Sequence, residues 1–195
     1  MNPGPRLSLI IADKRISEKL IIPKSIEKVF QVDKHIAATA AGILSDARIL
    51  IERAQVAAQQ HKVTYAEPIT TESLVKEICN LKQLYTQVGG ARPFGVSIMF
   101  AGHGEGAHVF VTDPTGIFFE YKATAIGEDE IKVKEILNKE YKDNMSKQDA
   151  IKLAVSALKR VMGKNFSVDR LDGAFIASSD KQFKRLKKED LNKAK

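Results

Sequence analysis

Apolar positions near the N-terminus recur with the short period of β-strands. Residues 7–12 form a compact apolar run, residues 28–32 alternate charged with apolar side chains, and residues 35–40 are small and apolar. Such runs predict three strands, and the two residues 33–34 predict a tight hairpin between the last two. The first forty residues are therefore expected to be mostly strand.

Beyond Gly42 the apolar period lengthens to that of amphipathic helices. Apolar residues three and four positions apart cover 43–58 and again 74–85, and Thr70 or Thr71 can cap the second helix. Strands are expected next, followed by two helices and two closing strands. The expected ranges are 94–101, 108–112, 117–121 and 123–126 for the strands, 129–141 and a stretch from Ser146 with its capping-box partner Asp149 for the helices, and 173–178 and 182–186 for the last strands.

The order of these elements predicts the fold class. Hairpin-length connections favour antiparallel pairing, and helices that arrive in consecutive pairs argue against alternating βαβ units. Two stacked antiparallel sheets, each covered on its outer face by a helix pair, bury every apolar stripe. We therefore expect an α+β fold, a four-layer α-β-β-α sandwich, formed by residues 1–195 as one domain.

Composition excludes several classes of protein. The 195 residues are 44% hydrophobic and 28% charged, which is ordinary for a globular domain and unlike a disordered or collagen-like chain. The longest apolar runs are far too short to cross a bilayer, and the first residues lack the apolar core of a signal peptide. The single cysteine, Cys79, falls in a helical pattern, so we expect a buried thiol in a reducing, cytoplasmic setting.

The net charge of +7 is concentrated near the C-terminus. Residues 181–195 hold seven Lys/Arg and two Asp/Glu, which leaves +2 on the rest of the chain. Such a basic C-terminal tail is typical of a solvated terminal segment, and phosphate binding is its alternative. No RRM, KH or helix-turn-helix pattern accompanies it, so nucleic acid is not the expected partner.

Motifs for catalysis or metal binding are weak. The glycine-rich stretch 102–106 lacks the Lys-Ser/Thr of a P-loop and joins two strands, and no Gly-x-Ser-x-Gly elbow is present. His103 and His108 can approach each other across a hairpin, but no third zinc ligand accompanies them. We therefore expect no cofactor and no metal.

Five stretches form an ordered, nearly gapless set of motifs between about residues 7 and 158. They are IADKR at 11–15, SIEKV at 25–29, GILSDARIL at 42–50, YTQ at 85–87 with GGARPFGVS at 89–97, and EYKATAIG at 120–127. Together they resemble the α subunits of the archaeal 20S proteasome. The fold of that family is also a four-layer α-β-β-α sandwich.

The resemblance implies a non-catalytic role. Proteasomal β subunits cut peptides with an N-terminal threonine whose own amino group is the general base, whereas this chain begins Met1-Asn2 and its motifs are of the α type. An α subunit forms a heptameric ring with other α subunits, binds β subunits below and receives a regulatory AAA ATPase above. The alternatives are an N-terminal-nucleophile peptidase of the β type and a stand-alone truncated homologue with a nucleic-acid-binding tail.

The resemblance also implies a pocket for the C-terminal tail of that ATPase. In α subunits the lysine at the position of Lys28 receives the carboxylate of the tail, and Gly42 and Ile43 match other residues of the pocket. An ammonium suits a carboxylate, and a glycine admits close backbone approach. Judged on the residues alone, Lys28 is a solvated lysine at a strand end and Gly42 only starts a helix.

Two departures from the family stand out. Its α subunits carry a longer N-terminal segment, with a gating tail, a helix across the top of the ring and the first strand of the sandwich, where this sequence has residues 1–6. A missing strand exposes a sheet edge. The second departure is the acidic run 128–130 after Gly127, which suits the N-terminus of a helix.

Overall fold

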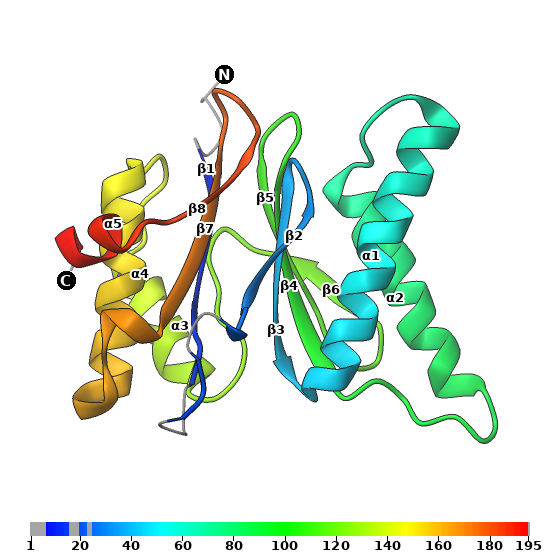
Figure 1. Ribbon diagram of the computed structural model, residues 1–195, viewed down its shortest axis with the longest axis horizontal. Helices are drawn as coiled ribbons and strands as arrows, with labels where there is room; N and C mark the ends of the chain where they lie inside the picture. Colours follow the sequence, from blue (N-terminus) through cyan, green and yellow to red (C-terminus); the bar gives the residue numbers. More distant parts are fainter. Residues whose placement is uncertain (1–6, 16–19, 23–24, 195) are drawn as a thin grey trace.

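Two antiparallel sheets lie face to face and helices cover both outer faces, so four layers follow one another across the molecule (Figure 1). The computed structural model describes residues 7–15, 20–22 and 25–194. The α+β, four-layer α-β-β-α sandwich expected from the order of the elements is confirmed.

The larger sheet has five strands in the order β2-β3-β4-β5-β6, and each pair of neighbours is antiparallel. Two long helices cover its outer face (Figure 1). The strands are β2 (Val29–Asp33), β3 (Ile36–Gly42), β4 (Val96–His103), β5 (Ala107–Thr112) and β6 (Phe118–Glu120), and the helices are α1 (Leu44–Tyr65) and α2 (Thr71–Gln87). Thr70 caps α2 by accepting a hydrogen bond from the Ser73 N–H, as the sequence predicts.

The smaller sheet has three antiparallel strands in the order β1-β7-β8. Helices cover its outer face, on the side of the molecule away from the larger sheet (Figure 1). The strands are β1 (Leu7–Asp13), β7 (Leu171–Ala177) and β8 (Phe183–Arg185), and the helices on this side are α3 (Glu130–Glu140), α4 (Lys147–Met162) and the short α5 (Lys188–Lys193). Ser146 caps α4 by accepting from the Asp149 N–H, at the expected position.

Apolar side chains pack in clusters in all three spaces between the layers. Ile10 of β1, Met99 of β4 and Ile176 of β7 meet between the two sheets. A second cluster joins α1 and α2 to the larger sheet, and a third joins α4 and α5 to the smaller one. Full burial of one such side chain contributes about 1.5–3 kcal/mol, so these clusters supply the main driving force for folding. Cys79 is buried in the second cluster, as expected, and burial raises its pKa to about 11.

The strand predicted over residues 123–126 is wrong. The ladder of the larger sheet ends where the Tyr121 N–H donates to the Val109 carbonyl at 2.8 Å. The chain then leaves the sheet and crosses towards α3, with Ile126 packed against the cluster between the sheets. The apolar positions of this run reflect burial during the crossing and not alternation on a ladder.

The basic segment expected at 181–195 is folded over the part that the structure describes. It contributes β8 and α5, and Leu191 is buried against α4. Three of its described cations form ion pairs within the chain, Lys184 with Asp180, Arg185 with Asp172 and Lys188 with Asp169. Among the described residues, no helix combines the length and the apolar character needed to cross a membrane.

Lys82 of α2 is a fully buried lysine. Its ammonium donates to Thr112 Oγ1 at 2.7 Å, to the Val96 carbonyl at 2.9 Å and to the Asp113 carbonyl at 3.0 Å. These bonds connect α2 to β4 and to the end of β5. Burial lowers the pKa of Lys82 to about 8, although nearby Asp113 acts in the opposite direction.

We expect the free energy of unfolding to change with pH in the alkaline range because of Lys82. Because the folded protein releases this proton near pH 8 and the unfolded chain holds it until about pH 10.5, the unfolded state binds more protons between these values, and the contribution of Lys82 to stability rises with pH. Melting temperatures of the native chain and of Lys82→Met at pH 7, 8.5 and 10 test this. The melting temperature of the native chain should rise relative to that of Lys82→Met as the pH rises. The difference between the native chain and Lys152→Met, which changes an exposed lysine, should stay constant. A constant difference for Lys82→Met as well would contradict the lowered pKa of Lys82.

Candidate functional site

Side chains from both sheets fix the backbone of Lys28. Its N–H donates to Asp172 Oδ2 at 3.0 Å, and its carbonyl accepts from Thr39 Oγ1 at 2.7 Å. The Val29 N–H donates to the same carboxylate oxygen of Asp172 at 3.1 Å. Asp172 belongs to β7 of the smaller sheet and Thr39 to β3 of the larger sheet. These bonds therefore attach the start of β2 to both sheets.

The Lys28 side chain is half-buried, and burial lowers its pKa. The Asp13 carboxylate raises this pKa and the Arg15 guanidinium lowers it, both to a smaller extent. Asp13 itself is paired with Arg170, which donates from Nη2 at 2.6 Å and from Nε at 3.0 Å. Within the described ranges Lys28 therefore has no carboxylate of its own, and its ammonium can pair with one from another molecule.

Gly42 ends β3 in a conformation that requires glycine. Its φ is 125°, and a Cβ at this position would lie 2.4 Å from the Gly95 carbonyl oxygen. The next residue, Ile43, donates its N–H to that same oxygen at 2.9 Å and forms the N-cap of α1. Gly42 thus allows β3 to pass closely over Gly95 before the chain turns into the helix.

Asp46 holds the start of α1 against the segment that precedes β4. Its carboxylate accepts from the Gly95 N–H at 2.8 Å and from two guanidinium nitrogens of Arg92 at 2.8 and 2.7 Å. Arg92 and the Gly95 N–H lower the pKa of the buried Asp46 carboxyl. The motifs at 42–50 and 89–97 are therefore one structural unit, although 46 positions separate Asp46 from Arg92.

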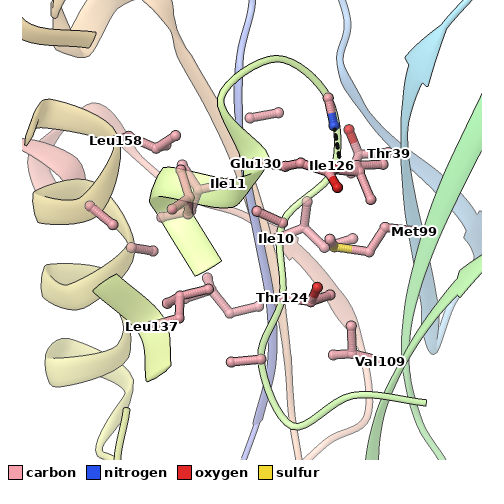
Figure 2. Close-up of a pocket in the computed structure, with 18 of the residues that line it drawn as sticks. Ile10, Ile11, Thr39, Met99, Val109, Thr124, Ile126, Glu130, Leu137 and Leu158 are labelled. Atoms are coloured by element: carbon pink, nitrogen blue, oxygen red, sulfur yellow. Dashed lines mark hydrogen bonds between the residues drawn. The ribbon is translucent and has the colours of Figure 1, made fainter. Parts of the chain in front are cut away.

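Lys28 and Gly42 lie on the wall of one cavity of about 1170 Å³. β1 borders this cavity over its whole length, with the end of β3 and the α3–α4 pair around it. Figure 2 shows its interior, where Ile10 of β1 lies between Thr39 and Met99 on one side and Leu137 and Leu158 on the other.

The third predicted residue, Ile43, is not among the residues that line the cavity. Its side chain reaches towards Gly95, where a Cβ would lie 2.6 Å from Ile43 Cδ1, and it is 44% exposed. Lys28 and Gly42 therefore line the same cavity, and Ile43 lies next to Gly42 on the surface. The Lys28 ammonium is suited to binding a carboxylate, whereas the close approach that Gly42 allows is made by Gly95 of the same chain.

The other candidates do not form a site in the described part of the chain. His103 is buried and neither of its ring nitrogens has a hydrogen-bond partner, and burial lowers its pKa. His108 Nδ1 lies 2.6 Å from Glu120 Oε1. The described residues contain no group of three or more His, Cys, Asp or Glu side chains placed to hold a metal ion. Met1 and Asn2, on which the expected absence of an N-terminal nucleophile rests, lie outside the described residues.

The acidic run after Gly127 lies at the start of α3, as expected, but does not cap the helix with a side chain. Glu130 Oε2 accepts from the Gly127 N–H at 3.2 Å, and Glu128 forms an ion pair with Arg15 of the segment after β1. Asp129, the N-cap residue of α3, makes no side-chain bond to the helix backbone and pairs with Lys132. The run therefore lies at the N-terminus of α3 and connects it to Arg15 on the rim of the cavity, but none of its side chains caps the helix.

Sequence reasoning missed Asp172, which organises Lys28. A single carboxylate within the apolar stretch LDGAFIA is a recognisable signal, because a buried charge needs partners. Its partners Lys28 and Arg185 come from distant parts of the chain, so the sequence could not identify them.

Comparison with known proteins gives consistent matches. The family model described as "Proteasome subunit" matches residues 5–176. "Proteasome subunit alpha" of Pyrococcus horikoshii is 45% identical over 185 residues, which is 95% of this chain and 71% of the relative. The protein of the same name from Methanopyrus kandleri is 48% identical over 181 residues, covering 92% and 72%. That of Methanocaldococcus jannaschii is 44% identical over 186 residues, covering 95% and 71%.

Proposed function

Since the chain belongs to the proteasome subunit family, as a non-catalytic subunit of the α type, we propose that Lys28 and Gly42 form a docking point for the C-terminal carboxylate of a regulatory ATPase. The observation that carries the proposal is the half-buried Lys28 ammonium, which shares a cavity wall with Gly42 and has no carboxylate partner of its own in the described ranges. Ile43, exposed beside them, supplies apolar contact to the residues before the carboxylate.

The proposed setting is the outer ring of a barrel-shaped protease. Seven copies of the chain would close a ring by repeating one contact, with β subunits on one face and the ATPase on the other. We place this assembly in the cytoplasm, where a single buried thiol such as Cys79 stays reduced. The α type of the chain argues against the alternative of a β-type peptidase.

Replacing Lys28 by alanine should remove binding of the ATPase tail and leave the ring intact. Truncating one member of a buried charge pair typically costs about 2–5 kcal/mol, and less where the pair is exposed to water. Anisotropy of a fluorescent peptide with the ATPase C-terminal sequence, titrated with assembled rings, measures the loss. Lys34→Ala, on the hairpin between β2 and β3, is the matched control and should bind normally.

Two further measurements test whether the loss of peptide binding reflects a pair between the C-terminal carboxylate of the peptide and the Lys28 ammonium. A peptide with an amidated C-terminus should bind native rings as weakly as the free-acid peptide binds Lys28→Ala rings. Because the pKa of Lys28 is lowered, binding should also decline with rising pH earlier than it would for an ordinary lysine. Equal affinity of native and Lys28→Ala rings for the free-acid peptide rules out the docking point.

A further inference from the structure

Asp13, the last residue of β1, is the carboxylate that acts on the Lys28 ammonium. Burial lowers the pKa of Lys28, the Asp13 carboxylate raises it, and the Arg15 guanidinium lowers it. A lysine this close to a carboxylate commonly forms an ion pair with it. In the described ranges Lys28 and Asp13 form none, and Asp13 is bound to Arg170 instead.

Both oxygens of the Asp13 carboxylate are occupied. Oδ1 accepts from Arg170 Nε at 3.0 Å and from the Arg15 N–H at 3.1 Å, and Oδ2 accepts from Arg170 Nη2 at 2.6 Å. A guanidinium donates through two N–H groups that match the two oxygens of a carboxylate, whereas the ammonium of a lysine is a single point charge. Arg170 therefore holds Asp13 more firmly than Lys28 would.

The fold fixes Arg170 through further contacts. Arg170 is the last residue of the short 3-10 helix η3 (Val168–Arg170) and directly precedes β7. Its Nη1 donates to the Asn165 carbonyl at 2.8 Å, and its own carbonyl accepts from the Lys14 N–H at 2.8 Å. Only 24% of its side chain is exposed. Arg170 is thus attached to the end of β1 through both its backbone and its guanidinium.

Three other carboxylates around Lys28 are also paired with arginines. They are Glu128, which pairs with Arg15, and Asp172 and Glu27, which both pair with Arg185. Asp172 accepts from the backbone N–H of Lys28 and not from its ammonium. Of these four carboxylates, Asp13 is the one that raises the pKa of Lys28. The partner of Asp13 therefore controls whether the Lys28 ammonium is taken up within the chain.

We propose that Arg170 is a positioning residue that keeps the Lys28 ammonium open to a carboxylate from another molecule. Arg170 does so by holding Asp13, which would otherwise pair with Lys28 and occupy it. Lysine has a long, flexible stem, so its ammonium can turn to a carboxylate that loses its partner. The identity of the incoming carboxylate as an ATPase tail rests on the proposed function, whereas the control of Lys28 by Arg170 does not depend on it.

Titration of Lys28 by NMR on the purified chain tests this control directly. The Lys28 Cε signal is identified by its absence from Lys28→Ala. In Arg170→Met the pKa of Lys28 should rise above its value in the native chain, because the released Asp13 carboxylate stabilises the charged amine. When Asp13→Asn is added to Arg170→Met, the pKa should return close to the native value. Arg160→Met, which breaks a pair with Glu140 between α3 and α4, is the matched control and should leave it unchanged.

Binding of the free-acid ATPase-tail peptide to assembled rings tests the consequence. Arg170→Met should weaken binding at least ~10-fold, because the peptide must displace Asp13 from Lys28. The double variant Asp13→Asn with Arg170→Met should bind within ~3-fold of native rings, since the competing carboxylate is gone. Arg170→Lys keeps the charge without the guanidinium fork and should retain part of the binding. Arg160→Met rings should bind like native rings.

The two measurements separate this inference from the proposed function. An unchanged pKa of Lys28 in Arg170→Met would overturn the control by Arg170, whatever the peptide does. Weak binding that persists in the double variant would show that Arg170 acts on the fold and not through Asp13, and would also overturn it. If native and Lys28→Ala rings bind the peptide equally, the docking point is lost, and the NMR titration alone decides whether Arg170 withholds Asp13 from Lys28.

Discussion

Gly42→Ala should lower the free energy of unfolding by about 3 kcal/mol or more. The backbone at Gly42 has a φ of 125°, where an L-residue is strained by roughly 1–3 kcal/mol. The added Cβ would also lie 2.4 Å from the Gly95 carbonyl oxygen and 2.9 Å from Val96 Cα, so β3 and β4 must move apart. Urea unfolding of the purified chain measures the loss.

Gly89→Ala is the control for this substitution. Gly89 has no atom within 4 Å of an ideal Cβ, and its φ is not in the left-handed region. The free energy of unfolding of Gly89→Ala should differ from that of the native chain by no more than about 0.5 kcal/mol, or be slightly higher, since alanine restricts the unfolded chain. If both glycine variants unfold at the same urea concentration, the backbone of β3 does not have the conformation described.

Asp172→Ala should be the second strongly destabilising change, with a loss of about 2–5 kcal/mol. The buried Asp172 carboxylate accepts from the N–H groups of Lys28 and Val29 and from the Arg185 guanidinium at 3.0 Å. Alanine would leave the Lys28 and Val29 amides without their acceptor, and Arg185 would lose one of its two carboxylate partners and keep Glu27. Thermal unfolding followed by calorimetry provides the measurement.

Two companion variants separate this effect from simple loss of charge. Asp172→Asn keeps one oxygen acceptor and should retain part of the stability. Asp169→Ala removes an exposed carboxylate paired with Lys188 and should leave the melting temperature nearly unchanged. A melting temperature for Asp172→Ala equal to that of Asp169→Ala would show that Asp172 does not hold the two sheets together.

The order of elements could be predicted because each is specified locally. The apolar stripe of α2, its Thr70 cap and the Ser146 cap of α4 depend on residues within one or two turns of each other. The hairpin between β2 and β3 is equally local and forms as expected, although its turn lies at residues 34–35 and not at 33–34, because Asp33 belongs to β2 and pairs with Ile36. The two sheets follow once neighbouring strands pair antiparallel.

The segment after Tyr121 could not be predicted in the same way. Its small and apolar residues fit a strand, but a strand also needs a neighbour, and the segment crosses between layers instead. Burial of Ile126 comes from packing against the cluster between the sheets, which involves residues far away in the chain. The periodicity of apolar residues indicates that a residue is buried, but it does not indicate which element covers that residue.

The candidate site was only partly visible in the sequence. Lys28 and Gly42 were selected by family resemblance, and the structure places both on one cavity wall. The groups that fix them, Asp172 and the Gly95 carbonyl, are joined through contacts over 144 and roughly 50 positions of sequence, which no local pattern encodes. Burial of Lys28 likewise depends on the layer opposite β2.

Native mass spectrometry of the chain mixed with an archaeal proteasome β subunit tests the central claim most directly. If the chain is a non-catalytic α-ring subunit, the mixture should contain particles with seven copies of the chain in each outer ring, and peptide hydrolysis should require the β subunit. A chain that stays monomeric with the β subunit at every concentration, or that hydrolyses peptides by itself, would contradict the account.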